Sequence, residues 1–138
     1  IWAMDDKINP ENRYIAQVWN TVNHYKSILN EKIIIFGDFN WNIIWDEKPS
    51  YPLKEDFQHL IDLFEEYDIV SSYHLKNQEE YGSETNPTLF MYRKENKPYH
   101  VDYIFVKNEL LKNTWKLKIG NYKDWREYSD HMPLQLEL

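Results

Sequence analysis

Residues 32–36 of the chain read KIIIF and lead directly into Gly37, Asp38 and Asn40. A run of β-branched and aromatic residues of this length is typical of a strand that is covered on both faces. Asp38 and Asn40 stand two positions apart just past that strand, so their side chains leave on the same side, where open α/β sheets place their ligand sites. A side-chain-capped turn after Gly37 is the structural alternative.

The rest of the chain predicts two helices and several further strands. Apolar residues recur at three- and four-residue intervals over 10–29 and 53–67, which predicts the helices. Beside 32–36, the predicted strands are 68–74, 89–92, 100–106, 114–120 and 132–138, and the stretches 41–52 and 75–88 are predicted loops. This order predicts one domain over 1–138 of α/β or α+β class, with a mostly mixed β-sheet and helices on one face. The other face then needs a covering layer that two helices do not supply.

Three further polar residues occur beside or within apolar sequence. Asp102 interrupts HVDYIFV (100–106), where a buried carboxylate needs a partner; the alternative is that it faces solvent. Asp130 and His131 directly precede the last predicted strand, where a turn can direct both into one cavity, as an oxygen ligand and a proton carrier. A plain loop pair is the alternative there. Four other histidines lack metal-ligand spacing and are assigned structural roles: His24, His59, His74 and His100.

Net charge and composition limit the classes of partner and the locations to be expected for this chain. The formal net charge of −7 argues against a long polyanionic partner, although acids that hold a divalent cation also add negative charge. A small phosphorylated substrate fits this balance better. The chain contains no cysteine, no leader and no apolar run long enough to span a bilayer, so we expect a soluble protein and favour a cytoplasmic location. Because the sequence opens within a predicted element, IWAM, we expect a truncated chain.

Taken in order, GDFN (37–40), HVDYIF (100–105) and SDHMPL (129–134) resemble the three C-terminal signatures of the endonuclease/exonuclease/phosphatase superfamily. The resemblance covers essentially the whole chain, but only the C-terminal half of the family's domain. It implies half of a four-layer α/β/β/α sandwich, in which the family's N-terminal sheet covers the open face. The family's early Asn and metal-binding Glu have no counterpart here, and IWAM replaces a segment that carries a histidine in many members.

The resemblance also implies a reaction: divalent-metal-dependent hydrolysis of a phosphoester by in-line attack of water. Asp130 would hold Mg²⁺ or Mn²⁺, and the Asn40 amide would donate to the phosphate. Asp38 would orient or deprotonate the water, or lie near a second metal position. His131 would contact the phosphate or transfer a proton while Asp102 fixes its tautomer. An Asp102 oxygen is therefore expected about 2.6–3.2 Å from a His131 nitrogen.

Several alternatives stay open at this point. The phosphoester substrate is a small molecule or a nucleic acid, and Arg93 and Trp125 are candidate contacts. A chain without the Glu can instead be a non-catalytic fragment or degenerate paralogue, which acts as a binding module. Its open sheet face would then be covered by the missing N-terminal half or by a second copy. Six tryptophans also permit a carbohydrate or small-ligand binder, although core packing explains most of them better.

Overall fold

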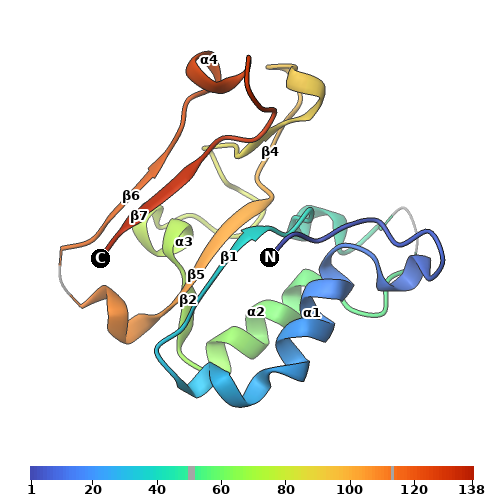
Figure 1. Cartoon of the computed structure of the whole chain (residues 1–138), viewed down its shortest axis with the longest axis vertical. Helices are drawn as coiled ribbons and strands as arrows, with labels where there is room; N and C mark the ends of the chain where they lie inside the picture. The colour runs from blue at the N-terminus through green and yellow to red at the C-terminus, as the bar shows by residue number, and fades with distance from the viewer. Residues whose placement is uncertain (50–51, 113) are drawn as a thin grey trace.

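The computed structural model describes residues 1–49, 52–112 and 114–138. Its α-helices are α1 (Ile15–His24), α2 (Phe57–Glu66), α3 (Ser72–Asn77) and α4 (Tyr122–Trp125). Its strands are β1 (Ile34–Asp38), β2 (Ile69–Ser71), β3 (Leu89–Phe90), β4 (Pro98–Tyr99), β5 (Asp102–Lys107), β6 (Lys116–Ile119) and β7 (Leu134–Glu137). Helices and strands interleave early and strands dominate later, which confirms the α+β class (Figure 1). Among the described residues, no helix combines the length and apolar character that crossing a bilayer requires.

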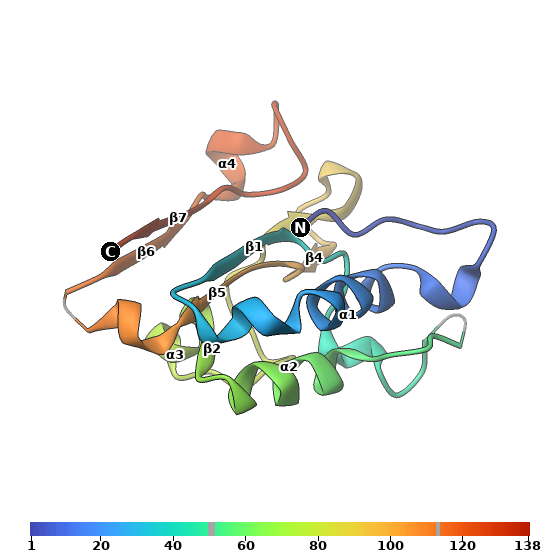
Figure 2. The same cartoon turned by 60° about the horizontal axis from the view of Figure 1, so that its bottom comes forward.

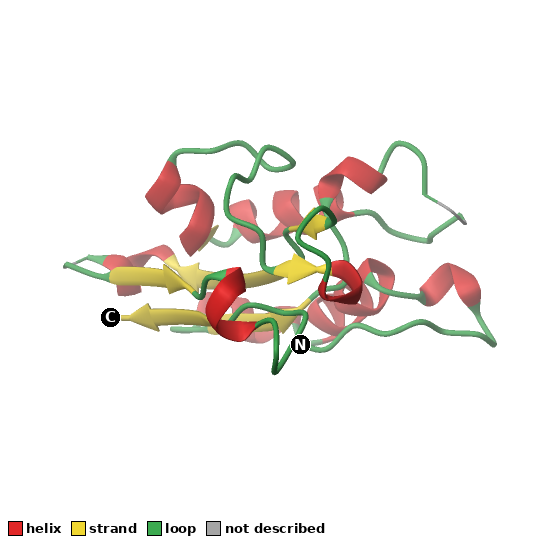
Figure 3. Cartoon of the chain, turned by 90° about the horizontal axis from the view of Figure 1, so that it is seen from above, coloured by secondary structure: helices red, strands yellow, loops and turns green. Residues whose placement is uncertain are grey.

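The strands form small antiparallel sheets. β5 is the central strand of the largest, in the order β1–β5–β2, and the pairs β3–β4 and β6–β7 form the other two. Seen from above, most strands lie roughly along one axis, with their arrows pointing in opposite directions (Figure 3). A parallel bridge joins Trp2 to Asp38 at the outer edge of β1. In the described parts of the chain, the predicted mixed sheet therefore exists only through this bridge, and the four-layer arrangement stays a prediction.

Helices α1 and α2 cover one face of the central sheet (Figures 1 and 2). Helix α2 begins at Phe57 because the Asp56 side chain accepts the backbone N–H of His59 at 2.8 Å. The apolar stripes of both helices pack against Tyr103 and Phe105 of β5, and the Phe105 ring lies 4.6 Å from that of Phe64. This core fixes the position of β5, whose first residue is Asp102.

The opposite face of the central sheet is covered only in part. Ile34 stands opposite Val106 and Phe36 opposite Ile104, so these four side chains share this face. The β6–β7 pair packs over Ile104 and Val106, but Ile34 remains 39% and Phe36 63% exposed. The prediction that residues 32–36 are covered on both faces is therefore wrong, because the second layer extends over β5 and stops short of β1.

Replacing Phe36 with threonine is expected to change the free energy of unfolding by no more than about 0.5 kcal/mol. The ring is mostly exposed, so little buried apolar area is lost, and threonine is β-branched, which strands also favour. Urea unfolding monitored by circular dichroism measures the change. A loss above about 2 kcal/mol would contradict an open face, because only a buried ring costs that much.

Several predicted elements have different bounds in the structure, and the largest differences concern the strand 68–74 and the helix 10–29. The predicted strand 68–74 ends at Ser71, and α3 begins at Ser72, whose hydroxyl donates to the Ile104 carbonyl at 3.0 Å. The predicted helix 10–29 is interrupted at Tyr14, whose φ of 50° is incompatible with a continuous right-handed helix. Residues 50 and 51 of the predicted loop 41–52 lie outside the described residues.

Candidate active site

The pairing of β1 with β5 places two acids opposite each other. Asp38 is the last residue of β1, Asp102 is the first of β5, and the two are register partners. Asp102 is further fixed by the segment before β3, because the Thr88 hydroxyl oxygen accepts the backbone N–H groups of Val101 and Asp102, each at 3.0 Å. Residues far apart in the sequence are thus held together by backbone structure.

The third side chain arrives from the segment before β7. His131 forms an antiparallel bridge with Leu89, and its backbone N–H donates to the Ser129 hydroxyl at 2.9 Å. The imidazole Nδ1 lies 2.9 Å from one carboxylate oxygen of Asp102 and 3.2 Å from the other. The expected Asp102–His131 distance is therefore observed. Because a carboxylate only accepts, Nδ1 carries the hydrogen and Nε2 is the nitrogen left for other contacts.

Asn40 forms hydrogen bonds with the Asp38 carboxylate in this structure. Its backbone N–H donates to Asp38 Oδ1 and its side-chain amide donates to Asp38 Oδ2, both at 2.8 Å. The same amide nitrogen donates to the Ala3 carbonyl at 2.9 Å, so both of its hydrogens are used. The capped turn considered from the sequence is thus present, and it holds the Asp38 carboxylate. Donation from the Asn40 amide to a phosphate would require one of these bonds to break.

The charges of the cluster shift two pKa values. Partial burial raises the pKa of Asp38, and the Asp102 charge raises it further, against the lowering effect of the Asn40 hydrogen bond. The hydrogen bond to Asp102 raises the pKa of His131, although burial alone would lower it. The site therefore holds a carboxylate that is more basic than usual beside an imidazole that is more readily protonated than usual.

One group of described residues has the spacing of a metal site. Ligand atoms of Asp38, Asp102 and His131 all lie within 4.8 Å of one another. Asp130, the predicted metal ligand, is not in this group. Its carboxylate is close enough for its charge to raise the pKa values of Asp38 and His131, and its carbonyl accepts the Phe90 N–H at 2.7 Å. The structure thus brings four of the five predicted residues into one cluster and places the fifth beside it.

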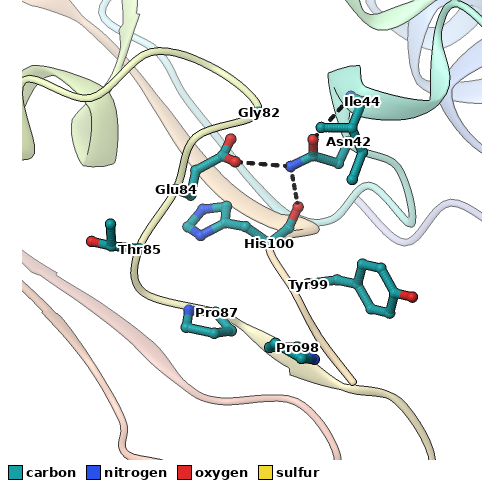
Figure 4. Close-up of a pocket in the computed structure, with 9 residues that line it drawn as sticks. All are labelled: Asn42, Ile44, Gly82, Glu84, Thr85, Pro87, Pro98, Tyr99 and His100. Carbon is teal, nitrogen blue, oxygen red and sulfur yellow. Dashed lines mark hydrogen bonds between the residues drawn. The ribbon is translucent and has the colours of Figure 1, made fainter. Parts of the chain in front are cut away.

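A second polar network, missed in the sequence, lies behind the strand ends. The Glu84 side chain is only 4% exposed and accepts from His74 Nε2 at 3.1 Å and from Asn42 Nδ2 at 3.2 Å. Asn42 also donates to the His100 carbonyl at 2.9 Å. Asn42, Glu84 and His100 line a cavity of about 290 Å³ together with Ile44, Tyr99 and Pro98 (Figure 4). The network ties the segment after β1 to the segment before β5.

Only one ring nitrogen of His100 forms a hydrogen bond in the described structure. Its Nδ1 lies 2.8 Å from the Asn86 carbonyl and donates to it, whereas Nε2 is buried without a hydrogen-bond partner in the described structure. Burial lowers the pKa of His100, which keeps the ring neutral near pH 7. The structural roles predicted for His74 and His100 agree with these contacts. The sequence gives little sign of this network, because Asn42 and Glu84 belong to no periodic pattern.

Stability is expected to fall as the pH drops below about 4.5, in part through Glu84. Burial alone would raise the pKa of Glu84, but hydrogen bonds from His74, the backbone and Asn42 hold it at about 2. Because this folded-state pKa lies below the unfolded value of 4.5, the contribution is full above pH 4.5 and is lost as the pH falls toward 2. Urea unfolding of the wild type and Glu84→Gln over this range measures it. A stability gap that stays constant with pH would contradict the assignment.

Comparison with known protein families and with curated proteins gave no match for this chain.

Proposed function

We propose that the cluster of Asp38, Asn40, Asp102 and His131 hydrolyses a phosphoester with the help of a divalent cation. The observation that supports this proposal most is the 2.9 Å contact between His131 and Asp102 beside a second, hydrogen-bonded carboxylate. An acid–imidazole pair next to an independent base supplies the groups that attack by water on phosphorus requires. The resemblance of the three sequence segments to the endonuclease/exonuclease/phosphatase superfamily points to the same chemistry.

Each side chain has a role that follows from its contacts. Asp102 holds the Nδ1–H tautomer of His131, so Nε2 can contact a phosphate oxygen or pass a proton. Asp38 takes the proton of the attacking water, and its raised pKa makes it a better base for that step. Asn40 keeps the Asp38 carboxylate in one orientation. Negative charge on the phosphate favours the protonated imidazole, which the raised pKa of His131 also favours.

The residues present fit a divalent cation. Two carboxylates and an imidazole converge within 4.8 Å, and oxygen ligands with at most one nitrogen suit Mg²⁺ or Mn²⁺. Asp130, from the adjoining turn, would hold the ion, and the charges of Asp38 and Asp102 nearby would favour it there. When bound, the cation would neutralise charge that develops on the phosphate oxygens.

Hydrolysis of bis(para-nitrophenyl) phosphate tests the proposal. The wild-type chain is titrated with Mg²⁺ and with Mn²⁺, and nitrophenolate release is followed against a sample that contains EDTA. We expect metal-dependent release that Asp102→Asn reduces while its circular dichroism spectrum is unchanged. Release that persists in EDTA, or that Asp102→Asn leaves intact, would refute a role for this cluster. Glu80→Ala, which replaces an exposed acid, is the matched control.

The open sheet face favours a second candidate function, that of a binding module. Trp2 is 73% exposed and Phe36 63%, and Met4 and Ile34 are also exposed. Large apolar side chains gathered at one strand edge are typical of a surface that another protein surface covers. The N-terminal half of a complete domain, or a second copy of the chain, would cover it.

Two measurements separate these occupants. Self-association of this chain in analytical ultracentrifugation supports the second copy. Hydrolysis gained only by a form extended at its N-terminus supports the half-domain.

A further inference from the structure

Two turns beside the candidate active site form one projecting surface, here called the rim. It consists of residues 91–97, between β3 and β4, and residues 121–128, which contain α4. Figures 1 and 2 show both segments standing out from the central sheet on the same side of the molecule. Arg93 joins them, because its guanidinium donates to the carbonyls of Glu127 and Tyr128 at 3.4 and 3.3 Å. The Tyr122 hydroxyl donates back to the Arg93 carbonyl at 2.7 Å.

The rim adjoins the turn that carries Asp130 and His131. Phe90, the last residue of β3, donates its N–H to the Asp130 carbonyl at 2.7 Å, and its ring lies 4.5 Å from that of Tyr122. Tyr128 precedes His131 by three residues. The rim is therefore built from the chain segments that adjoin the candidate site, so groups next to a phosphate bound there would have the rim nearby.

The rim exposes large aromatic rings that the fold does not use. Tyr92 is 71% exposed, Tyr128 76% and Trp125 41%. Ring contacts position part of this set: Trp125 and Tyr128 lie 6.4 Å apart, and Lys97 Nζ lies 5.4 Å from the Tyr92 ring centre. An exposed ring with a cation beside it is a suitable platform for a planar, negatively charged ligand.

The rim also differs in charge from the rest of the chain. It carries five cations and three carboxylates, whereas the whole chain has a formal net charge of −7. The cations are Arg93, Lys94, Lys97, Lys123 and Arg126, all of them exposed. An excess of cations on this surface alone favours a ligand that carries several negative charges in a row.

We propose that the rim binds an unpaired nucleic-acid strand and presents one of its phosphodiesters to the candidate active site; this inference rests on the proposed function. Free bases stack on Tyr92 and Tyr128, and the rim cations contact the adjacent phosphates. A duplex buries the faces of its bases against each other, so it offers these rings no stacking partner. The substrate class is therefore a polynucleotide with single-stranded character, which replaces the small phosphorylated molecule favoured by net charge alone.

Fluorescence anisotropy with a labelled single-stranded oligonucleotide of mixed sequence tests this inference. The assay contains EDTA, so that binding is measured without hydrolysis. We expect the wild type to bind the single strand more tightly than its duplex. Tyr92→Ala and Tyr128→Ala should each weaken binding about fivefold or more, whereas Tyr92→Phe and Tyr128→Phe, which keep the ring, should bind like the wild type. Tyr25→Ala, which removes an exposed ring from the end of α1, is the control and should have no effect.

Salt dependence tests the cations separately. Lys94→Ala and Lys123→Ala should each lower the slope of log Kd against log salt concentration by roughly 0.7, and Lys32→Ala should not. Equal affinity for strand and duplex, equal loss in the Ala and Phe variants, or equal binding to anionic phosphatidylserine vesicles would overturn the inference. So would the absence of binding at low salt. Metal-dependent hydrolysis of the small diester together with any of these outcomes would leave the proposed function intact and remove only the nucleic-acid assignment.

Discussion

Replacing His131 with alanine is expected to lower the turnover of a phosphodiester by about 10²–10⁴-fold, the usual contribution of a positioned acid–base group. The imidazole has a ring nitrogen within 4.8 Å of carboxylate oxygens of both Asp38 and Asp102. Its removal takes away the group that can donate to a phosphate oxygen. Folding should be retained, because the ring is partly exposed and its contacts are those with Asp102. Initial rates at saturating Mn²⁺, with circular dichroism as the check on folding, measure the effect.

Two companion variants sharpen the result. His24→Ala removes an exposed histidine from α1 and should leave turnover unchanged. Combining Asp102→Asn with His131→Ala should cost little more than His131→Ala alone, because Asp102 acts through the imidazole. Additive losses would mean that the two side chains act independently, and near-normal turnover in His131→Ala would show that the histidine has no part in the reaction.

Two acids of the candidate site can be predicted from the residues because each one breaks a local pattern, whereas Asp130 and His131 are singled out mainly by the resemblance of SDHMPL. Asp102 interrupts an apolar strand and Asp38 follows one, so the residue pattern alone is enough to single out both acids. The actual partner of the Asn40 amide cannot be predicted in this way. Its hydrogens go to Asp38 and to the Ala3 carbonyl, and the second contact spans 37 positions of sequence. Such bonds depend on tertiary placement rather than on any pattern in the chain.

The fold shows the same division between local and long-range information. Periodicity predicts α2 well, because its buried face repeats every three to four residues. The segment IVSSYH is ambiguous, because a strand of three residues that runs straight into a helix of six leaves no period long enough to read. The exposure of Phe36 is likewise hidden in the sequence: four apolar residues in a row predict burial on both sides, but whether a second layer reaches β1 depends on where β6 and β7 pack.

The hydrogen bonds of Glu84 hold together the segments that carry the candidate site, so their loss should lower the stability of the fold. Replacing Glu84 with alanine is expected to lower the free energy of unfolding by about 3–5 kcal/mol, the usual effect of removing one partner from a buried, hydrogen-bonded pair. His74 and Asn42 would each keep a buried N–H without its carboxylate acceptor. Against a typical total of about 5–15 kcal/mol, this is a large fraction of the stability. Urea unfolding near pH 7 measures it.

The expected size of this effect follows from burial rather than from charge alone. Glu80 lies four residues earlier and is exposed, so Glu80→Ala should change stability by about 0.5 kcal/mol or less. Glu84→Gln keeps an acceptor for Asn42 and should be intermediate. Since Asn42 joins the segment that follows Asp38 to the His100 carbonyl, two residues before Asp102, the alanine variant should also lose turnover under conditions where it is still folded. Equal effects at positions 80 and 84 would mean that the network holds neither the fold nor the two acids in place.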